Sequence, residues 1–276
     1  MSMGKPFISV IIPALNEEHF LPKLLESLSH QHFTNFEVIV VDGKSKDKTV
    51  AVALAFTQKV PNLTVVVADH ASLPYQRNYG ADRAKGDWLI FIDADTVVYS
   101  YTLERLHAHI VGSEESLFTT WFSPDSDDVN DVRLTLFGIF FFEFSKSIKR
   151  AISPGPFTIV RKTTFQSIGG YDVEHPFLED QDFSQRMTKA GHSLSIIRES
   201  LYIWSLRRYR KEGTAKVLQA YTRSILPILF SKRVPKNMKG YEMGGQIFSR
   251  KKKHVKSTVI KQTERKMKKL MQDIFE

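Results

Sequence analysis

The chain has 276 residues, of which 42% are hydrophobic and 25% are charged, a composition typical of a globular protein with a sizeable core. It contains no cysteine, which excludes a disulfide framework, a thiolate zinc site, an iron–sulfur cluster and a cysteine nucleophile. Its 39 basic and 30 acidic residues give a formal net charge of +9.

The basic charge is concentrated at one end. Residues 1–205 contain 19 Lys and Arg against 25 Asp and Glu, whereas residues 206–276 contain 20 against 5. Such a basic end favours an anionic partner, either nucleic acid or a membrane surface. No apolar run approaches the roughly 20 residues needed to span a bilayer, and no signal-peptide core is present. We therefore expect a cytoplasmic protein, with peripheral contact to a membrane left open.

Apolar, β-rich runs alternate with helical spacings through the first hundred residues. The runs are continuous, as in strands that are buried on both faces of a sheet. This alternation predicts an α/β fold with a doubly wound, mostly parallel sheet, whose ligands bind at the carboxyl ends of the strands. The predicted strands are 7–12, 36–41, 63–67 and 88–92, and the predicted helices are 17–30, 47–58 and 75–85.

The second half of the chain is less regular. An acidic loop over 123–131 precedes an aromatic-rich segment that is apolar nearly all round and ends in basic residues. A helix of this kind lies in a protein core or in a membrane interface. The predicted helices are 102–111, 134–150 and 184–190, the predicted strands are 117–122 and 157–160, and the chain from 207 onward is expected to be basic and helical in pieces.

Polar residues follow the predicted strands where a ligand site is expected. Asp93 and Asp95 come directly after the fourth strand, and two such hard oxygen ligands suit Mg²⁺ or Mn²⁺. They could instead cap the next helix. Arg77 lies one helix earlier and can reach the same crevice, although an exposed helix face is an equally good interpretation.

Two further groups have the composition of a site. Glu179 and Asp180 follow apolar residues, and a buried carboxylate is a common general base. They also suit a helix N-terminus, and both interpretations can hold together. The arginines Arg207, Arg208 and Arg210 could clamp a diphosphate or simply lie at the surface.

These residues, taken in order, resemble a family 2 glycosyltransferase with the GT-A fold. The resemblance covers roughly residues 7–210, and the ordered set of motifs is far more specific than any one of them. The motifs are Ser9-Val-Ile-Ile-Pro-Ala-Leu-Asn-Glu-Glu18, Val40-Val-Asp-Gly-Lys-Ser-Lys-Asp-Lys-Thr49, Arg77-Asn-Tyr-Gly80, Ala84-Lys-Gly-Asp-Trp-Leu-Ile-Phe-Ile-Asp-Ala-Asp95, Gly169-Gly-Tyr-Asp172, Leu178-Glu-Asp180 and Arg186 with Ala190-Gly191.

The resemblance implies roles for individual positions. It makes Asp180 the catalytic base, with Glu179 helping to place the acceptor. Asp95 is then the more direct ligand of a divalent metal, Mn²⁺ or Mg²⁺, and Asp93 lies nearer the ribose and phosphate. The implied nucleotide-sugar-binding residues are Pro13, Ala14, Glu17, Asp42, Ser45, Arg77, Asp93, Arg207 and Arg208.

The resemblance also implies a reaction and a domain organisation. It implies inverting transfer of a sugar from a nucleoside-diphosphate sugar by a single displacement. Residues 1–215 would form the GT-A domain, with a nucleotide-sugar-binding half over 7–98 and an acceptor half over 99–215, and residues 216–276 a basic helical extension. The chain departs from the family at Lys44, where an acid or Gly-Ser is usual, and at Trp204-Ser205, where many relatives have a histidine. It lacks the Q-x-x-R-W signature of processive synthases.

The expected partners are a nucleoside-diphosphate sugar and a lipid-linked or cell-envelope acceptor. Basic clusters beside apolar segments favour anionic lipid, so we expect peripheral attachment at the cytoplasmic face of a membrane through the basic C-terminal region. We expect no specific nucleic acid, because no recognised nucleic-acid module accompanies the basic end. Two other classes stay open, a non-catalytic nucleotide-sugar-binding module and a nucleic-acid-binding protein with a basic tail.

Overall fold

A computed structural model describes residues 4–147, 153–175, 177–215 and 217–219, together with the single residues Thr222, Arg265, Lys268 and Lys269. The predicted helix end at residue 150 and most of the predicted basic extension over 216–276 lie outside the described residues. Among those that are described, no helix combines the length and the apolar character needed to cross a membrane.

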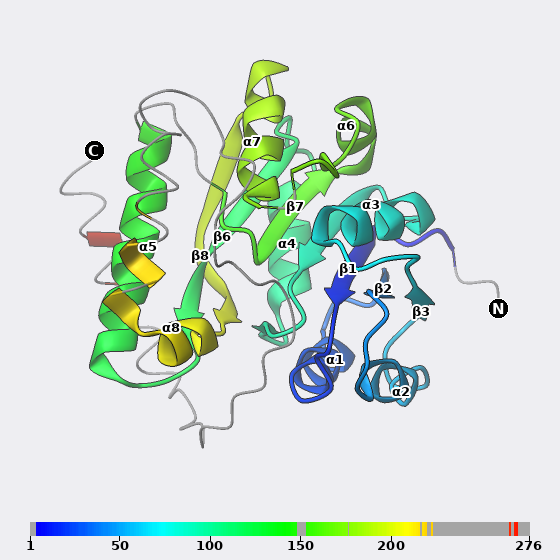
Figure 1. The fold of residues 1–276 in the computed structure, drawn as a ribbon. Coiled ribbons are helices and arrows are strands. Elements are labelled where there is room, and N and C mark those ends of the chain that lie inside the picture. Colours follow the sequence, from blue (N-terminus) through cyan, green and yellow to red (C-terminus); the bar gives the residue numbers. More distant parts are fainter. Residues whose placement is uncertain are drawn as a thin grey trace.

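In the described part of the chain, eight strands form a single mixed sheet, which runs across the middle of Figure 1. They are β1 (Ile8–Ala14), β2 (Phe36–Asp42), β3 (Leu63–Val67), β4 (Trp88–Ile92), β5 (Val97–Val98), β6 (Leu117–Pro124), β7 (Phe157–Arg161) and β8 (Leu194–Trp204). Their spatial order is β3-β2-β1-β4-β7-β6-β8-β5. The first four are parallel, β7 is antiparallel to both β4 and β6, β8 is parallel to β6, and β5 is antiparallel to β8. The sheet is therefore mostly parallel, as predicted.

Helices cover both faces of this sheet (Figure 1). They are α1 (Leu21–Ser29), α2 (Thr49–Leu54), α3 (Leu73–Arg83), α4 (Thr102–Ile110), α5 (Val129–Ser147), α6 (Lys162–Ser167), α7 (Glu179–Lys189) and α8 (Arg207–Glu212). Alternate residues of β1 separate two cores: Val10 and Ile12 pack with α1 and α4, whereas Ile11 packs with α3, α6 and α7. A strand buried on both faces needs apolar residues at every position, which explains the continuous runs in the sequence.

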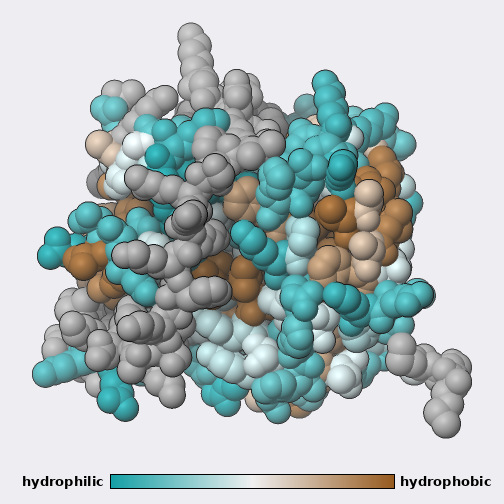
Figure 2. Space-filling view, turned by 90° about the horizontal axis from the view of Figure 1, so that it is seen from below, coloured by the Kyte–Doolittle hydropathy of each residue, from teal (hydrophilic) through white to brown (hydrophobic). Residues whose placement is uncertain are grey.

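Apolar side chains also reach the surface. In the view of Figure 2 they gather on the side where α2 and β3 lie, at the edge of the sheet. Leu54 and Val67 are 51% and 49% exposed there. Isolated apolar residues on a surface are ordinary, so this edge by itself does not indicate a binding site.

The predicted strands are confirmed to within one or two residues, but several helix boundaries differ. Helix α5 begins at Val129, inside the predicted acidic loop, because the Asp128 carboxylate accepts a hydrogen bond from the Asn130 N–H at 2.8 Å and provides a start for the helix. Helix α7 begins at Glu179 and not at Ser184, directly after Leu178, which has a left-handed backbone conformation. The elements β5, α6 and β8 were not predicted.

Helix α5 has an unusual distribution of polar residues. Its buried residues include Thr135, Glu143 and Ser145, whereas Phe137 and Phe144 are 59% and 42% exposed. The Glu143 carboxylate accepts a hydrogen bond from the buried Trp121 indole N–H at 2.9 Å. This contact fixes which side of α5 packs against the sheet.

Replacing Glu143 by Leu should lower the free energy of unfolding by about 1–3 kcal/mol, because the buried Trp121 N–H then loses its acceptor. Urea unfolding followed by fluorescence measures the change. Glu143→Gln keeps an acceptor oxygen and should cost much less. Equal losses for the two variants would show that this hydrogen bond does not hold the helix.

Candidate active site

One pocket collects most of the predicted site residues at the carboxyl ends of β1 and β4. Its volume is about 690 Å³, within the usual range for small-molecule sites. Strands, the start of α7 and the start of α8 all contribute to its walls. The predicted residues that line it are Pro13, Ala14, Glu17, Arg77, Asp93, Asp95, Glu179, Asp180, Arg207 and Arg208.

Arg77 links two groups of carboxylates at this pocket. One terminal nitrogen of its guanidinium donates to Glu179 at 2.7 Å, and the other donates to Asp93 and to the Gly155 carbonyl, both at 3.0 Å. The side chain is only 1% exposed and its guanidinium lies over the Tyr171 ring, 5.1 Å from the centroid. The interpretation of Arg77 as part of an exposed helix face is therefore wrong.

Arg207 makes a second link, between Glu17 and Asp95. Its terminal nitrogens donate to both oxygens of Glu17, at 2.8 Å and 2.5 Å, and its Nε lies 2.9 Å from Asp95 Oδ2. The guanidinium also lies over the Phe20 ring, 4.5 Å from the centroid. Arg207 thus holds the carboxylate that the family resemblance makes a metal ligand. Asp95 is followed by a turn and β5, so the interpretation of this pair as a helix cap is wrong.

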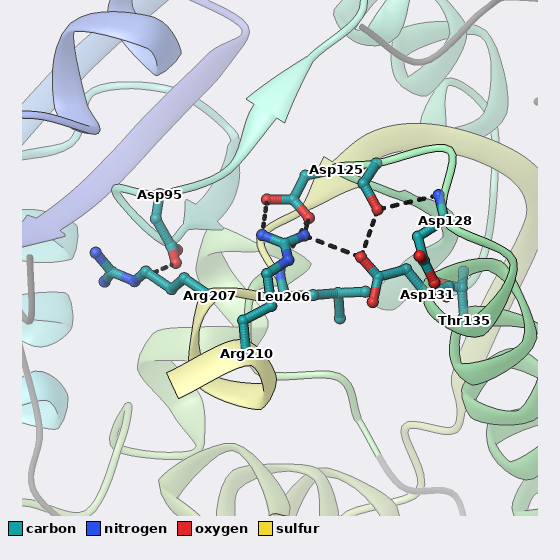
Figure 3. A network of polar contacts seen from close by, with 9 residues as sticks. Asp95, Asp125, Asp128, Asp131, Thr135, Leu206, Arg207 and Arg210 are labelled. Atoms are coloured by element: carbon teal, nitrogen blue, oxygen red, sulfur yellow. Dashed lines mark hydrogen bonds and ion pairs between the residues drawn. The ribbon is translucent and has the colours of Figure 1, made fainter. Parts of the chain in front are cut away.

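Helix α8 is held in place by its third arginine (Figure 3). Arg210 is ion-paired with Asp125 at the end of β6 and with Asp131 in the first turn of α5. The Leu206 N–H, just before the helix, donates to Asp125 at 3.3 Å. In Figure 3 the Arg207 side chain extends toward Asp95 and the Arg210 side chain toward Asp125, so Arg210 anchors α8 while Arg207 reaches the pocket.

Asp42 and Ser45 are the predicted residues that do not line this pocket. Asp42 is paired with Ala14 across β1 and β2, and its Oδ2 accepts from the Ser45 N–H at 2.9 Å. Ser45 in turn accepts from the Asn16 N–H at 2.8 Å. The other oxygen of Asp42 is buried without a hydrogen-bond partner among the described residues. These residues therefore lie beside the pocket, at the end of β2 and in the loop that follows it.

Burial raises the pKa of several acids at the pocket. It raises the pKa of Glu17 to about 7, against the opposing effect of Arg207. It also raises the pKa of Asp95, Glu179 and Asp180 above their ordinary values, since Arg77 and Arg207 only partly offset the loss of solvation. A raised carboxyl pKa is common for acid–base groups in active sites. Glu179 and Asp180 lie in the first turn of α7, which confirms the helix N-terminus interpretation. They also line the pocket, and the general-base interpretation stays a prediction.

The residues at Asp95 fit a divalent cation. Two carboxylates that follow one strand line the same pocket and supply the hard oxygen donors that such a cation prefers. Arg207 is paired with Asp95 in this structure, so a bound metal would compete with its guanidinium. A separate acidic group, Asp172, His175 and Asp182, has ligand atoms within 4.8 Å of one another, but none of the three lines the pocket. It is partly neutralised by Arg186, which is 2.7 Å from Asp182.

Sequence reasoning missed several pocket residues. Gly155 lies between α5 and β7, and its carbonyl accepts a hydrogen bond from Arg77. The apolar residues of α5 that line the pocket, such as Phe137 and Phe141, were considered only as core or membrane contacts. No local signal identifies either group, because both acquire their role from segments distant in sequence.

The family follows from a comparison with known proteins. Residues 9–169 match the family described as Glycosyl transferase family 2, which is more than half of the chain. The chain belongs to this family. A PGL/p-HBAD biosynthesis glycosyltransferase from Mycobacterium bovis BCG is 32% identical over 187 residues, which are 67% of this chain and 70% of that protein. Glycosyltransferase AglE from Haloferax volcanii is 29% identical, over 71% of this chain and 66% of AglE.

Solved structures of glycosyltransferases share the fold. TarS 1–349 of S. aureus, in complex with UDP-GlcNAc, superposes with a TM-score of 0.59 at 23% identity, over 72% of this chain and 58% of that one. The mannosyltransferase PcManGT from Pyrobaculum calidifontis, in complex with GDP-Man and Mn²⁺, has a TM-score of 0.64 at 17% identity, over 84% of this chain and 66% of that one. The predicted GT-A fold is thus confirmed for this family 2 glycosyltransferase.

Replacing Arg77 by Met should cost about 3–5 kcal/mol of the free energy of unfolding, because Glu179 then stays buried without its ionic partner. Urea or thermal unfolding measures the loss. Arg83 lies exposed on the same helix, so Arg83→Met is the matched control and should change stability by less than about 1 kcal/mol. Similar values for the two variants would contradict the linking role of Arg77.

Proposed function

We propose that this glycosyltransferase moves a sugar from a nucleoside-diphosphate sugar to an acceptor hydroxyl or phosphate, with inversion and in a single displacement. The observation that carries the proposal is the shared pocket, in which Arg77 joins Asp93 on the donor side to Glu179 beside Asp180. A leaving diphosphate and an accepting group could therefore meet in one site. The UDP-GlcNAc and GDP-Man complexes of TarS and PcManGT support a donor of this class.

The chemistry assigned to each residue follows from its charge and its surroundings. Asp180 takes the proton of the acceptor hydroxyl as that oxygen bonds to the anomeric carbon, and the bond from this carbon to the diphosphate oxygen breaks. The electron pair leaves with the diphosphate. Glu179 orients the acceptor, and Arg207 and Arg208 attract the departing charge. Burial raises the pKa of Asp180, so its carboxylate is a stronger base for the acceptor proton than an exposed aspartate would be.

Asp95 and Asp93 would hold Mn²⁺ or Mg²⁺ when a metal is bound. The metal supplies positive charge that neutralises the diphosphate. Arg207 would then share Asp95 with the metal or move toward the diphosphate. Pro13, Ala14 and Glu17 border the space for the ribose and the base, and the partnerless oxygen of Asp42 suits an N–H donor of the base.

Replacing Asp180 by Asn should lower sugar transfer by at least about 100-fold, because an amide cannot take the acceptor proton. Donor binding, measured by calorimetry, should stay within about twofold of the wild type. Asp182→Asn is the control, since Asp182 lies on the same helix outside the pocket.

The pH profile gives a second readout of the same base. Only the ionised carboxylate accepts a proton, so wild-type kcat should fall on acidification at pH values clearly above 3.8, the ordinary pKa of Asp. Normal transfer by Asp180→Asn would overturn the assignment of the base. That result would not contradict the family or the proposed donor.

Donor binding should depend on a divalent metal through Asp95. A thermal-shift panel of nucleotide sugars, each with Mn²⁺ and with EDTA, should show stabilisation by one donor that requires the metal, because a ligand of the folded state raises its apparent stability. Asp95→Ala should abolish the effect of the metal. If no nucleotide sugar stabilises the protein with any metal, the transferase proposal fails in favour of another role.

We also propose that the protein is cytoplasmic and binds the cytoplasmic face of a membrane peripherally, where a lipid-linked or cell-envelope acceptor is met. The exposed Phe144 of α5 and the basic composition of residues 216–276 support this attachment. Each Lys or Arg near an anionic leaflet contributes about 1 kcal/mol.

The protein should sediment with anionic liposomes at low salt and remain in solution with neutral ones. Deletion of residues 231–276 should reduce sedimentation, because it removes most of the Lys and Arg residues of the basic end over 206–276. Unchanged sedimentation after the deletion would refute attachment through this region. Equal or stronger binding to random duplex DNA would instead favour a nucleic-acid partner.

A further inference from the structure

One face of α5 forms an apolar wall of the pocket. Leu134, Phe137, Gly138 and Phe141 follow the spacing i, i+3, i+4 and i+7, which places them on one side of a helix, and all four line the pocket. None of them has a polar side chain. Leu178 and Trp204, from other elements, line the same space. The pocket therefore has both a charged region, at the carboxylates, and an apolar one.

The packing of α5 keeps this face toward the pocket. Glu143 is bound by Trp121 in the sheet, so the helix cannot turn its phenylalanines inward without breaking a buried hydrogen bond. Phe137 consequently stays 59% exposed at the pocket. Exposure of an aromatic ring to water is unfavourable, and a bound apolar group that covers the ring would be stabilised by removing that surface from water.

Gly138 adds space on the same face. Among the described residues, a Cβ atom there would meet only Phe122 Cζ, at 3.4 Å, so a methyl group would fit at an ordinary contact distance. Glycine inside a helix is less favourable than alanine by about 0.5–1 kcal/mol. Its presence leaves room at the pocket wall.

We propose that this face of α5, named here the α5 wall and consisting of Leu134, Phe137, Gly138 and Phe141, binds a hydrocarbon part of the acceptor next to the group that receives the sugar. The inference rests on the proposed function. The donor is polar and charged, so it belongs with Asp95 and Arg207. A purely saccharide acceptor would need hydrogen-bonding side chains, and the α5 wall offers none.

The test uses the full chain and alkyl β-D-glucopyranosides as probes, with methyl, hexyl and octyl chains, each below its micelle concentration. Calorimetry measures the dissociation constants, and maltose serves as a saccharide without a hydrocarbon chain. Affinity should rise with chain length, by up to about fourfold for each methylene group that is buried. Maltose should bind no better than the methyl glucoside.

Two exposed phenylalanines of α5 distinguish an effect at the pocket from an effect of any exposed aromatic residue on this helix. Phe137 lines the pocket and Phe144 does not, although both are exposed. Phe137→Ser should reduce the preference for octyl over methyl glucoside by about tenfold, and Phe144→Ser should leave it unchanged. Gly138→Leu, which adds bulk to the α5 wall, should also weaken octyl binding.

Absence of any chain-length preference, or equal effects of Phe137→Ser and Phe144→Ser, would overturn the inference. Tight maltose binding that is lost in Phe137→Ser would overturn it in favour of a sugar-stacking site. Failure of the inference is distinguishable from failure of the proposed function. If nucleotide sugars bind with Mn²⁺ and Asp180→Asn loses transfer, the function stands whatever the alkyl glucosides do.

Discussion

The buried guanidinium of Arg77 is the interaction on which the arrangement of the site depends. A fully buried cation is tolerated only when several acceptors surround it, and here Glu179, Asp93 and a backbone carbonyl do so. Its partners come from β4, from α7 and from the turn before β7. The ion therefore fixes the relative position of the parallel half of the sheet and the half that follows, and the pocket lies at this junction.

The parallel part of the fold was predictable because its physics is local. A strand buried on both faces is a continuous apolar run, and helical spacing between such runs implies the crossover connections. The strand order and the elements of the later half were less accessible. Strand β8 mixes buried and exposed residues and shifts register against β6, so it has no clean period, and β5 has only two residues.

The site residues were predictable as a set, but their contacts were not. Asp93, Asp95 and Asp180 stand in recognisable motifs. Glu179, to which Arg77 donates a hydrogen bond, lies 102 residues away from it in sequence. Nothing near Arg77 distinguishes a buried guanidinium from an exposed one. The burial of Glu143 and the exposure of phenylalanines on α5 could not be predicted for the same reason, since the role of Glu143 depends on Trp121 in a different element.

Gly155 lies next to both Arg77 and Asp180. Its carbonyl accepts from Arg77, and a Cβ atom on it would lie 2.9 Å from Asp180 Oδ2. A methyl group at this position would therefore press on the proposed base. Under the proposed mechanism, the absence of a side chain at residue 155 is therefore a requirement of the base and not only of the turn.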